Sequence, residues 1–251
     1  TQFMVGLMDG TALGATDPRM PRMLAPNRDG GFVGVDILIN NSWSGLPNNI
    51  EPNNPHGYPT TGGVNLPQLY LFSDLAKVPV MTYAQLQFVK AEAAFRAGNK
   101  ALALTAYRAG INGHFDFVNN RNRESGLATQ IPATERNAFL ANTAVVPTDP
   151  NALTLTQIMT QKYIAQWGWA FIESWMDMRR YHYTDLDPAT GQPVYPGYQM
   201  PPTFHSFNEG KPVYRLRPRY NSEYVWNRAG LDVIGGLALD YHTKPLWIIT
   251  P

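Results

Sequence analysis

The chain of 251 residues contains no cysteine, which excludes disulfides, thiolate metal sites and thiol nucleophiles within it. Its five histidines stand apart, and none falls in an HExxH or other paired spacing, so the sequence predicts no metal site. The patterns GxSxG, GxxxxGK[ST] and GxGxxG are also missing. We therefore expect no cofactor and no catalytic residue, and we interpret the protein as a non-enzyme.

The sequence also has little net charge and no long hydrophobic run. The sequence contains 20 Lys and Arg residues and 19 Asp and Glu residues, so its formal charge is +1. This balance predicts no basic region that would bind nucleic acid or anionic lipid. No apolar run reaches the roughly 18 residues that suggest a membrane-spanning helix. A hydrophobic content of 44% is enough for a folded core. These features favour a neutral partner.

A helical hairpin is predicted within Met81–Ile111. Thr82 and Gln85 have the spacing of a capping box, which starts a helix. Gly98 supplies the left-handed residue that ends this helix, and Asn99 suits the tight turn that follows. A second helix then begins, in which Tyr107 is expected to fill the groove between the two. The predicted buried stripe of the first helix consists of Leu86, Val89, Ala93 and Ala94.

The hairpin has the order of small residues, Gly-Asn turn and tyrosine that is typical of a tetratricopeptide unit. One such unit cannot bury its own apolar face, so we expect further helices to pack on it.

A second long helix is predicted from Thr154 to about Tyr183, with a bend at Gly168. Trp167, Trp169 and Trp175 recur at helical spacing and are expected in the core, together with Ile164, Phe171 and Met178. The charged residues near its end are interpreted as an ion-pair network that holds the C-terminal segments: Glu173, Asp177, Arg179 and Arg180.

Three segments together resemble the SusD/RagB family of nutrient-binding outer-membrane lipoproteins. The first is MTYAQLQFVKAEAAFRAGN, which keeps the AEA triplet and has Gln85 where the family usually has glutamate. The second carries the family's QK and E-x-W-x-D-x-R-R signature on Gln161, Lys162, Glu173, Trp175, Asp177, Arg179 and Arg180. The third, Arg219 to Asn227, is similar to R-Y-P-x-x-E-x-x-x-N, with Asn221 in place of proline.

The resemblance implies a mostly α, SusD-like fold in which tetratricopeptide-type hairpins support long ordered loops and a few short strands. Because family members are about twice as long and begin with a lipidation cysteine, the chain is expected to be the C-terminal part of a single SusD-like domain, whose N-terminal half is missing. Its expected regions are a loop-rich part at 1–80, the hairpin at 81–120, the long helix at 154–183, and a loop and hairpin tail at 184–251.

The loop-rich part is the candidate ligand-binding region. Aromatic rings offer flat faces to sugar rings while amides satisfy hydroxyls, and the resemblance places ligand aromatics in the loops before the last hairpin. Trp43, which asparagines flank in the sequence, is the main candidate for a ring on which a sugar stacks. An equally favoured alternative is that Trp43 packs the loop against the helices. The candidate ligand-binding residues are Asn41, Trp43, Asn48 and Tyr58.

The tail is expected to contain a β-hairpin in which 204–207 pairs with 213–216. Short strands are also expected at 32–39 and 69–72.

By resemblance, the expected function is non-catalytic binding of an oligosaccharide at the cell surface, on a lipid-anchored protein facing outside, for delivery to a SusC-like TonB-dependent outer-membrane transporter. Two alternatives remain open. One is a helical-repeat adaptor whose groove binds a peptide or protein. The other is a glycan-processing enzyme, which requires two facing carboxylates in a cleft, about 5–10 Å apart.

Overall fold

The computed structural model describes residues 1–27, 29–35, 70–71, 77–124 and 130–250. These residues form two compact units. The larger comprises residues 1–174 and 184–198, the smaller comprises 175–183 and 199–251, and their division falls within one helix. The candidate ligand-binding residues Asn41, Trp43, Asn48 and Tyr58 lie outside the described part of the chain.

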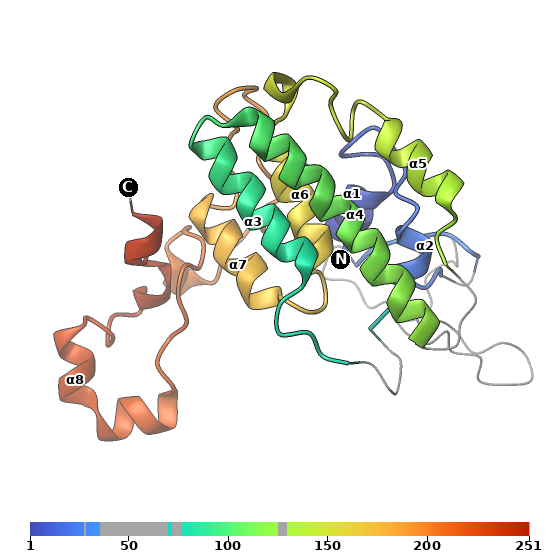
Figure 1. The fold of residues 1–251 in the computed structure, drawn as a ribbon. Coiled ribbons are helices and arrows are strands. Elements are labelled where there is room, and N and C mark those ends of the chain that lie inside the picture. The colour runs from blue at the N-terminus through green and yellow to red at the C-terminus, as the bar shows by residue number, and fades with distance from the viewer. Residues whose placement is uncertain (28, 36–69, 72–76, 125–129, 251) are drawn as a thin grey trace, which may run out of the picture. The chain divides into compact units, whose positions relative to one another are not determined.

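The predicted mostly helical class is confirmed (Figure 1). The α-helices are α1 (Gln2–Met8), α2 (Met20–Met23), α3 (Tyr83–Arg96), α4 (Lys100–Glu124), α5 (Ala133–Ala141), α6 (Leu155–Gln166), α7 (Phe171–Arg180) and α8 (Arg228–Val233). Short 3-10 turns occur at Pro150–Ala152, Ser206–Asn208, Tyr241–Thr243 and Trp247–Ile249, and a π-helical turn at Tyr220–Tyr224.

The predicted hairpin is formed by α3 and α4, which lie side by side (Figure 1). Thr82 caps α3 by accepting a hydrogen bond from the Gln85 backbone N–H at 3.1 Å. Gly98 has φ +79°, as the turn requires, and the Asn99 side chain accepts from Leu102 N–H at the start of α4. Tyr107 is fully buried and donates to the Val145 carbonyl at 2.8 Å. The predicted turn between the two helices, with Gly98 in a left-handed conformation and Asn99 after it, is therefore confirmed.

The predicted apolar stripe of α3 is wrong at Leu86, Val89 and Ala93, which are exposed, and right at Ala94, which is buried. Leu86 is 50% exposed and Val89 42% exposed, whereas Phe88 and Ala91 are fully buried. The reason lies in α4, where Gly110 removes a side chain directly beneath the Phe88 ring: a Cβ there would come within 2.8 Å of it. The ring thus reaches the α4 backbone, and this contact selects the buried face of α3.

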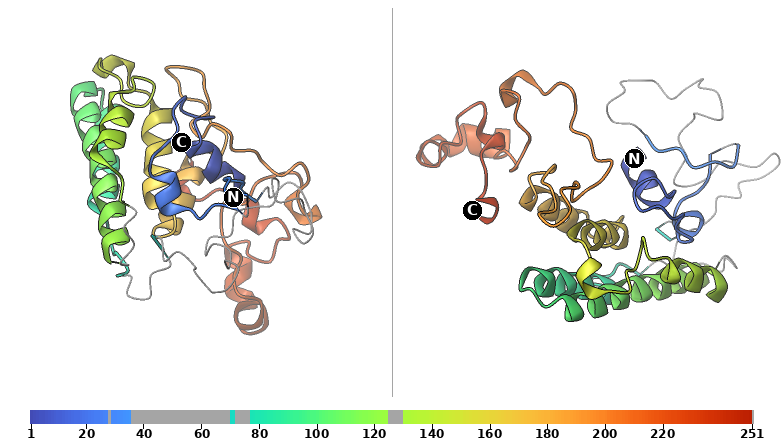
Figure 2. Two further views of the ribbon diagram at one scale, coloured as in Figure 1. Left: turned by 90° about the vertical axis from the view of Figure 1, so that its right-hand side faces the viewer. Right: turned by 90° about the horizontal axis from the view of Figure 1, so that it is seen from above.

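A third helix, α6, packs along both members of the hairpin (Figure 2). It begins with a complete capping box, in which Thr154 and Gln157 satisfy each other's backbone N–H groups. It ends where Gly168 adopts φ +83°, so the predicted bend is a full interruption between α6 and α7. The α6–α7 turn places residues 167–170 beside the entry to α3.

The predicted β-hairpin at 204–216 does not form. His205 instead caps a 3-10 turn by accepting from the Phe207 N–H at 3.2 Å, and Glu209 takes a left-handed conformation. The Tyr214 N–H donates to the His242 carbonyl, so the second predicted strand is held by a different segment. In the described residues the only bridge of β type joins Leu186 and Pro193. Of the strands expected at 32–39 and 69–72, the described halves, 32–35 and 70–71, form no strand, and the other halves lie outside the described residues.

Candidate functional site

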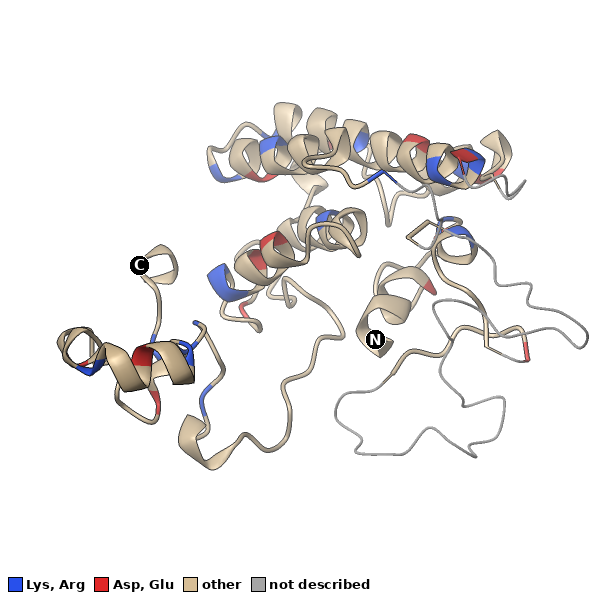
Figure 3. Ribbon diagram, turned by 90° about the horizontal axis from the view of Figure 1, so that it is seen from below, with Lys and Arg blue, Asp and Glu red and all other residues tan. Residues whose placement is uncertain are grey.

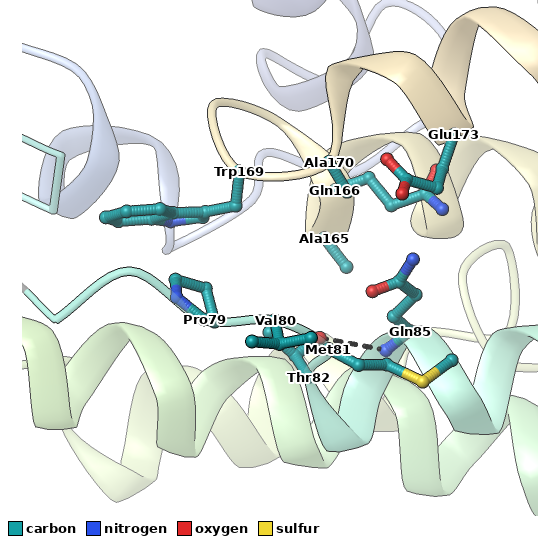
Figure 4. A pocket seen from close by; sticks show the side chains of 10 residues that line it. All are labelled: Pro79, Val80, Met81, Thr82, Gln85, Ala165, Gln166, Trp169, Ala170 and Glu173. Carbon is teal, nitrogen blue, oxygen red and sulfur yellow. Dashed lines mark hydrogen bonds between the residues drawn. The ribbon is translucent and has the colours of Figure 1, made fainter.

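A pocket opens between the entry to α3 and the α6–α7 turn, within the larger unit (Figure 4). Its cavity volume is about 20 Å³, which is room for about one water molecule. Residues 79–85 form one wall, and residues from the end of α6 to the first turn of α7 form the other. Two segments about 80 positions apart in the sequence therefore meet here.

Three polar side chains from three helices converge on the pocket (Figure 4). Gln85 comes from α3, Gln166 from the end of α6 and Glu173 from the first turn of α7. Gln166 is held in place because its Oε1 accepts a hydrogen bond from the Ser174 hydroxyl at 3.1 Å. The amides can donate hydrogen bonds to a hydroxyl and accept them from it, and the carboxylate can accept them.

The apolar end of the pocket is made by Trp169 and Pro79, which lie one above the other in Figure 4. The Arg121 guanidinium lies 4.4 Å from the centre of the Trp169 ring, and Phe117 meets the ring edge-on at 6.3 Å between centroids. These contacts hold the indole rigidly. Trp169 is half-buried, in partial agreement with its predicted place in the core.

Two sequence neighbours of the residues that line the pocket carry exposed aromatic side chains. Tyr83, next to the cap residue Thr82, is 60% exposed, and Phe171, the first residue of α7, is 69% exposed. The prediction that Phe171 lies in the core is therefore wrong, since the interruption at Gly168 turns the first residue of α7 outward.

The two residues of the QK signature are buried in separate polar clusters. Gln161 accepts a hydrogen bond from the guanidinium of the fully buried Arg19, which also forms an ion pair with Asp17. Lys162 forms an ion pair with Glu92 of the AEA triplet at 3.1 Å, with both side chains about 5% exposed. The QK signature thus joins α6 to α3 and to the segment before α2.

The other signature residues divide between the two units. In the smaller unit the Arg179 guanidinium stacks 3.7 Å from the Trp175 ring centre and donates to the Tyr214 carbonyl at 2.7 Å. Asp177 pairs with Arg180 at 2.6 Å. These contacts agree with a network that holds C-terminal segments. Glu173 takes no part in them and lines the pocket instead.

In the third family-like segment, Glu223 accepts a hydrogen bond from the Asn227 side chain at 2.8 Å, across the π-helical turn.

His114 gives the buried cluster a dependence on pH. Because Arg19 donates to His114 Nδ1 at 2.8 Å, that nitrogen must be unprotonated, and Nε2 carries the proton toward the Tyr70 hydroxyl at 3.2 Å. Burial, and next the charge of Arg19, hold the pKa of His114 well below its ordinary 6.5.

We expect the free energy of unfolding to fall as the pH drops below about 6.5, because the unfolded chain then takes up a proton that the folded chain refuses. Urea unfolding between pH 7.5 and 5.5 measures this slope. His114→Gln should flatten the slope, whereas the exposed control His205→Gln should keep it. A slope that His114→Gln leaves unchanged would contradict this assignment.

Acidic and basic residues are interspersed along the helices of the described part of the chain (Figure 3). In that part of the chain no helix is long and apolar enough to cross a bilayer. Nor do three or more His, Asp or Glu side chains gather there as a metal site would require.

The hairpin of α3 and α4, with α6 packed on it through the buried signature residues, defines a mostly helical fold. The model of a SusD-like family, described as starch-binding and associating with the outer membrane, matches residues 2–204. The chain belongs to this family. No curated protein and no solved structure matches it.

Proposed function

We propose that this protein binds an oligosaccharide at the cell surface, without catalysis, and delivers it to a SusC-like TonB-dependent outer-membrane transporter. The observation that carries the proposal is the family match over residues 2–204. In the proposal the protein is lipid-anchored, faces outside, and continues in an N-terminal half that precedes this sequence. The candidate ligand-binding residues remain Asn41, Trp43, Asn48 and Tyr58, and no cofactor takes part.

Two features of the protein support a neutral ligand. The net charge is +1 and both signs are interspersed (Figure 3), so no strong field favours an ionic partner. The pocket combines amides with a nearby aromatic ring, which is the pairing that sugar recognition uses. Neither feature requires catalysis.

Calorimetric titration against plant, host and microbial oligosaccharides tests the proposal. Binding is expected for one glycan class, and Trp43→Ala is expected to raise its Kd about tenfold or more, which is about 1.4 kcal/mol or more. Trp247→Ala removes a highly exposed tryptophan of the tail and should leave the Kd within about twofold. Absence of binding across the panel would refute the proposal, whereas binding that Trp43→Ala leaves unchanged would move the site elsewhere.

A helical-repeat adaptor is the second candidate, and one observation favours it. Leu86 and Val89 form an outward apolar stripe on α3, and such stripes suit an amphipathic helix of a partner. Titration with helical peptides distinguishes the two candidates, because the adaptor should bind peptide in a manner that Leu86→Ser weakens. A glycan-binding protein should show no such effect.

A further inference from the structure

The smaller unit contains a segment, residues 220–239, that exposes many large apolar side chains. This segment, called the arm here, comprises the π-helical turn Tyr220–Tyr224, α8 and the residues that follow α8 (Figure 1). Its large apolar side chains with exposed fractions of 56% to 88% are Tyr220, Val225, Trp226, Val233, Ile234 and Leu239. Single exposed apolar residues are ordinary on a protein, whereas a concentration of them marks an interaction surface.

The arm is held in shape by other groups. The Tyr224 hydroxyl accepts a hydrogen bond from the Arg217 guanidinium at 2.7 Å and donates one to the Gly236 carbonyl at 2.8 Å. The same guanidinium donates to the Leu239 carbonyl at 3.0 Å, and the Leu231 side chain is buried. These contacts close the arm without its exposed apolar side chains, which are therefore available to a partner.

The smaller unit is also the basic part of the chain. It contains eight Lys and Arg residues and five Asp and Glu residues, so its net charge is +3, and the chain's total of +1 leaves −2 for the larger unit. The even total, which predicted no region for anionic lipid, therefore conceals a basic unit. Arg219 and Arg228 are exposed on either side of Trp226 in the sequence. Exposed aromatic, aliphatic and arginine side chains together are typical of segments that lie in the interface of a lipid bilayer.

A bilayer fits the arm better than a protein partner does. A lipid surface accommodates protruding side chains without a matching groove, whereas a protein interface requires shape complementarity. The family whose model matches residues 2–204 is described as associating with the outer membrane, and the arm lies beyond the matched residues. We infer that the arm docks on a bilayer surface with anionic head groups, where Trp226 and Val233 enter the head-group region and Arg219 and Arg228 pair with phosphates. This contact is separate from the proposed lipid anchor and does not depend on glycan binding.

Flotation of the full chain, without a lipid anchor, on vesicles of phosphatidylethanolamine and phosphatidylglycerol tests the docking. The unaltered protein should float with the vesicles, and Trp226→Ala should lower its partition coefficient about tenfold because the indole no longer enters the interface. The double variant Arg219→Gln, Arg228→Gln should lower the coefficient about fivefold or more. Trp226 is 85% exposed, so its loss should leave the melting temperature unchanged. The control Phe171→Ala removes an exposed aromatic ring of the larger unit and should leave the coefficient within about twofold.

The outcomes of the flotation experiment decide the inference without reference to glycan. Flotation that Trp226→Ala weakens and Phe171→Ala does not weaken supports docking by the arm. Flotation that Trp226→Ala leaves unchanged overturns it, because another surface then holds the lipid. Absence of flotation also overturns it, and a dimer in sedimentation velocity that Trp226→Ala dissociates would then assign the arm to contact between two copies of the chain.

Discussion

Replacing Arg19 with methionine is expected to lower the free energy of unfolding by about 3–5 kcal/mol. Arg19 is fully buried, and its guanidinium donates to the Asp17 carboxylate, to Gln161 and to His114. Without it, the Asp17 charge stays buried with its main partner gone, and Gln161 and His114 each lose a hydrogen bond. Urea unfolding followed by circular dichroism measures the loss.

The double variant Asp17→Leu, Arg19→Met should recover much of this loss, since removing both charges removes the uncompensated one. Arg22→Met is a matched control, because Arg22 pairs with Glu135 near the surface and should cost less than about 1 kcal/mol. If Arg19→Met costs no more than Arg22→Met, the buried cluster does not stabilise the fold.

Lys162→Met is expected to cost about 3 kcal/mol for a similar reason. It leaves the Glu92 carboxylate buried between α3 and α6, with Arg96 as a weaker neighbour at 3.5 Å. Denaturant unfolding again provides the measurement.

Adding Glu92→Gln to Lys162→Met should restore part of the stability, because the unpaired Glu92 charge between α3 and α6 is then removed. Lys77→Met serves as the comparison: it breaks an exposed pair with Glu124 and should have almost no effect. Equal losses for Lys162→Met and the double variant would show that packing, and not the ion pair, accounts for the effect.

The sequence predicted those parts of the fold that depend on local chemistry. Gly98 and Asn99 specify the turn of the hairpin through their own backbone preferences, and Gly168 similarly interrupts the long helix. The buried face of α3 was not predicted, because the choice between Leu86 and Phe88 depends on the partner helix. Gly110 and Gly113 in the middle of α4 were the available signal for a close approach.

The sequence did not predict the pocket, because the pocket also depends on how the helices pack. Gln85 was interpreted as part of a helix cap and Glu173 as a member of an ion-pair network, and each interpretation is reasonable within its own segment. Only the packing of α3 against α6 brings the two residues to one pocket. Likewise, charge alone predicts that Lys162 needs a partner, but not that Glu92, 70 positions earlier, provides it.

Hydrogen–deuterium exchange of the full chain, with and without saturating neutral oligosaccharide, tests the central claim most directly. Glycan binding at the candidate residues predicts slower exchange in 40–58 and unchanged exchange in the tail around Trp247. Equal exchange with and without glycan in 40–58 would contradict the account.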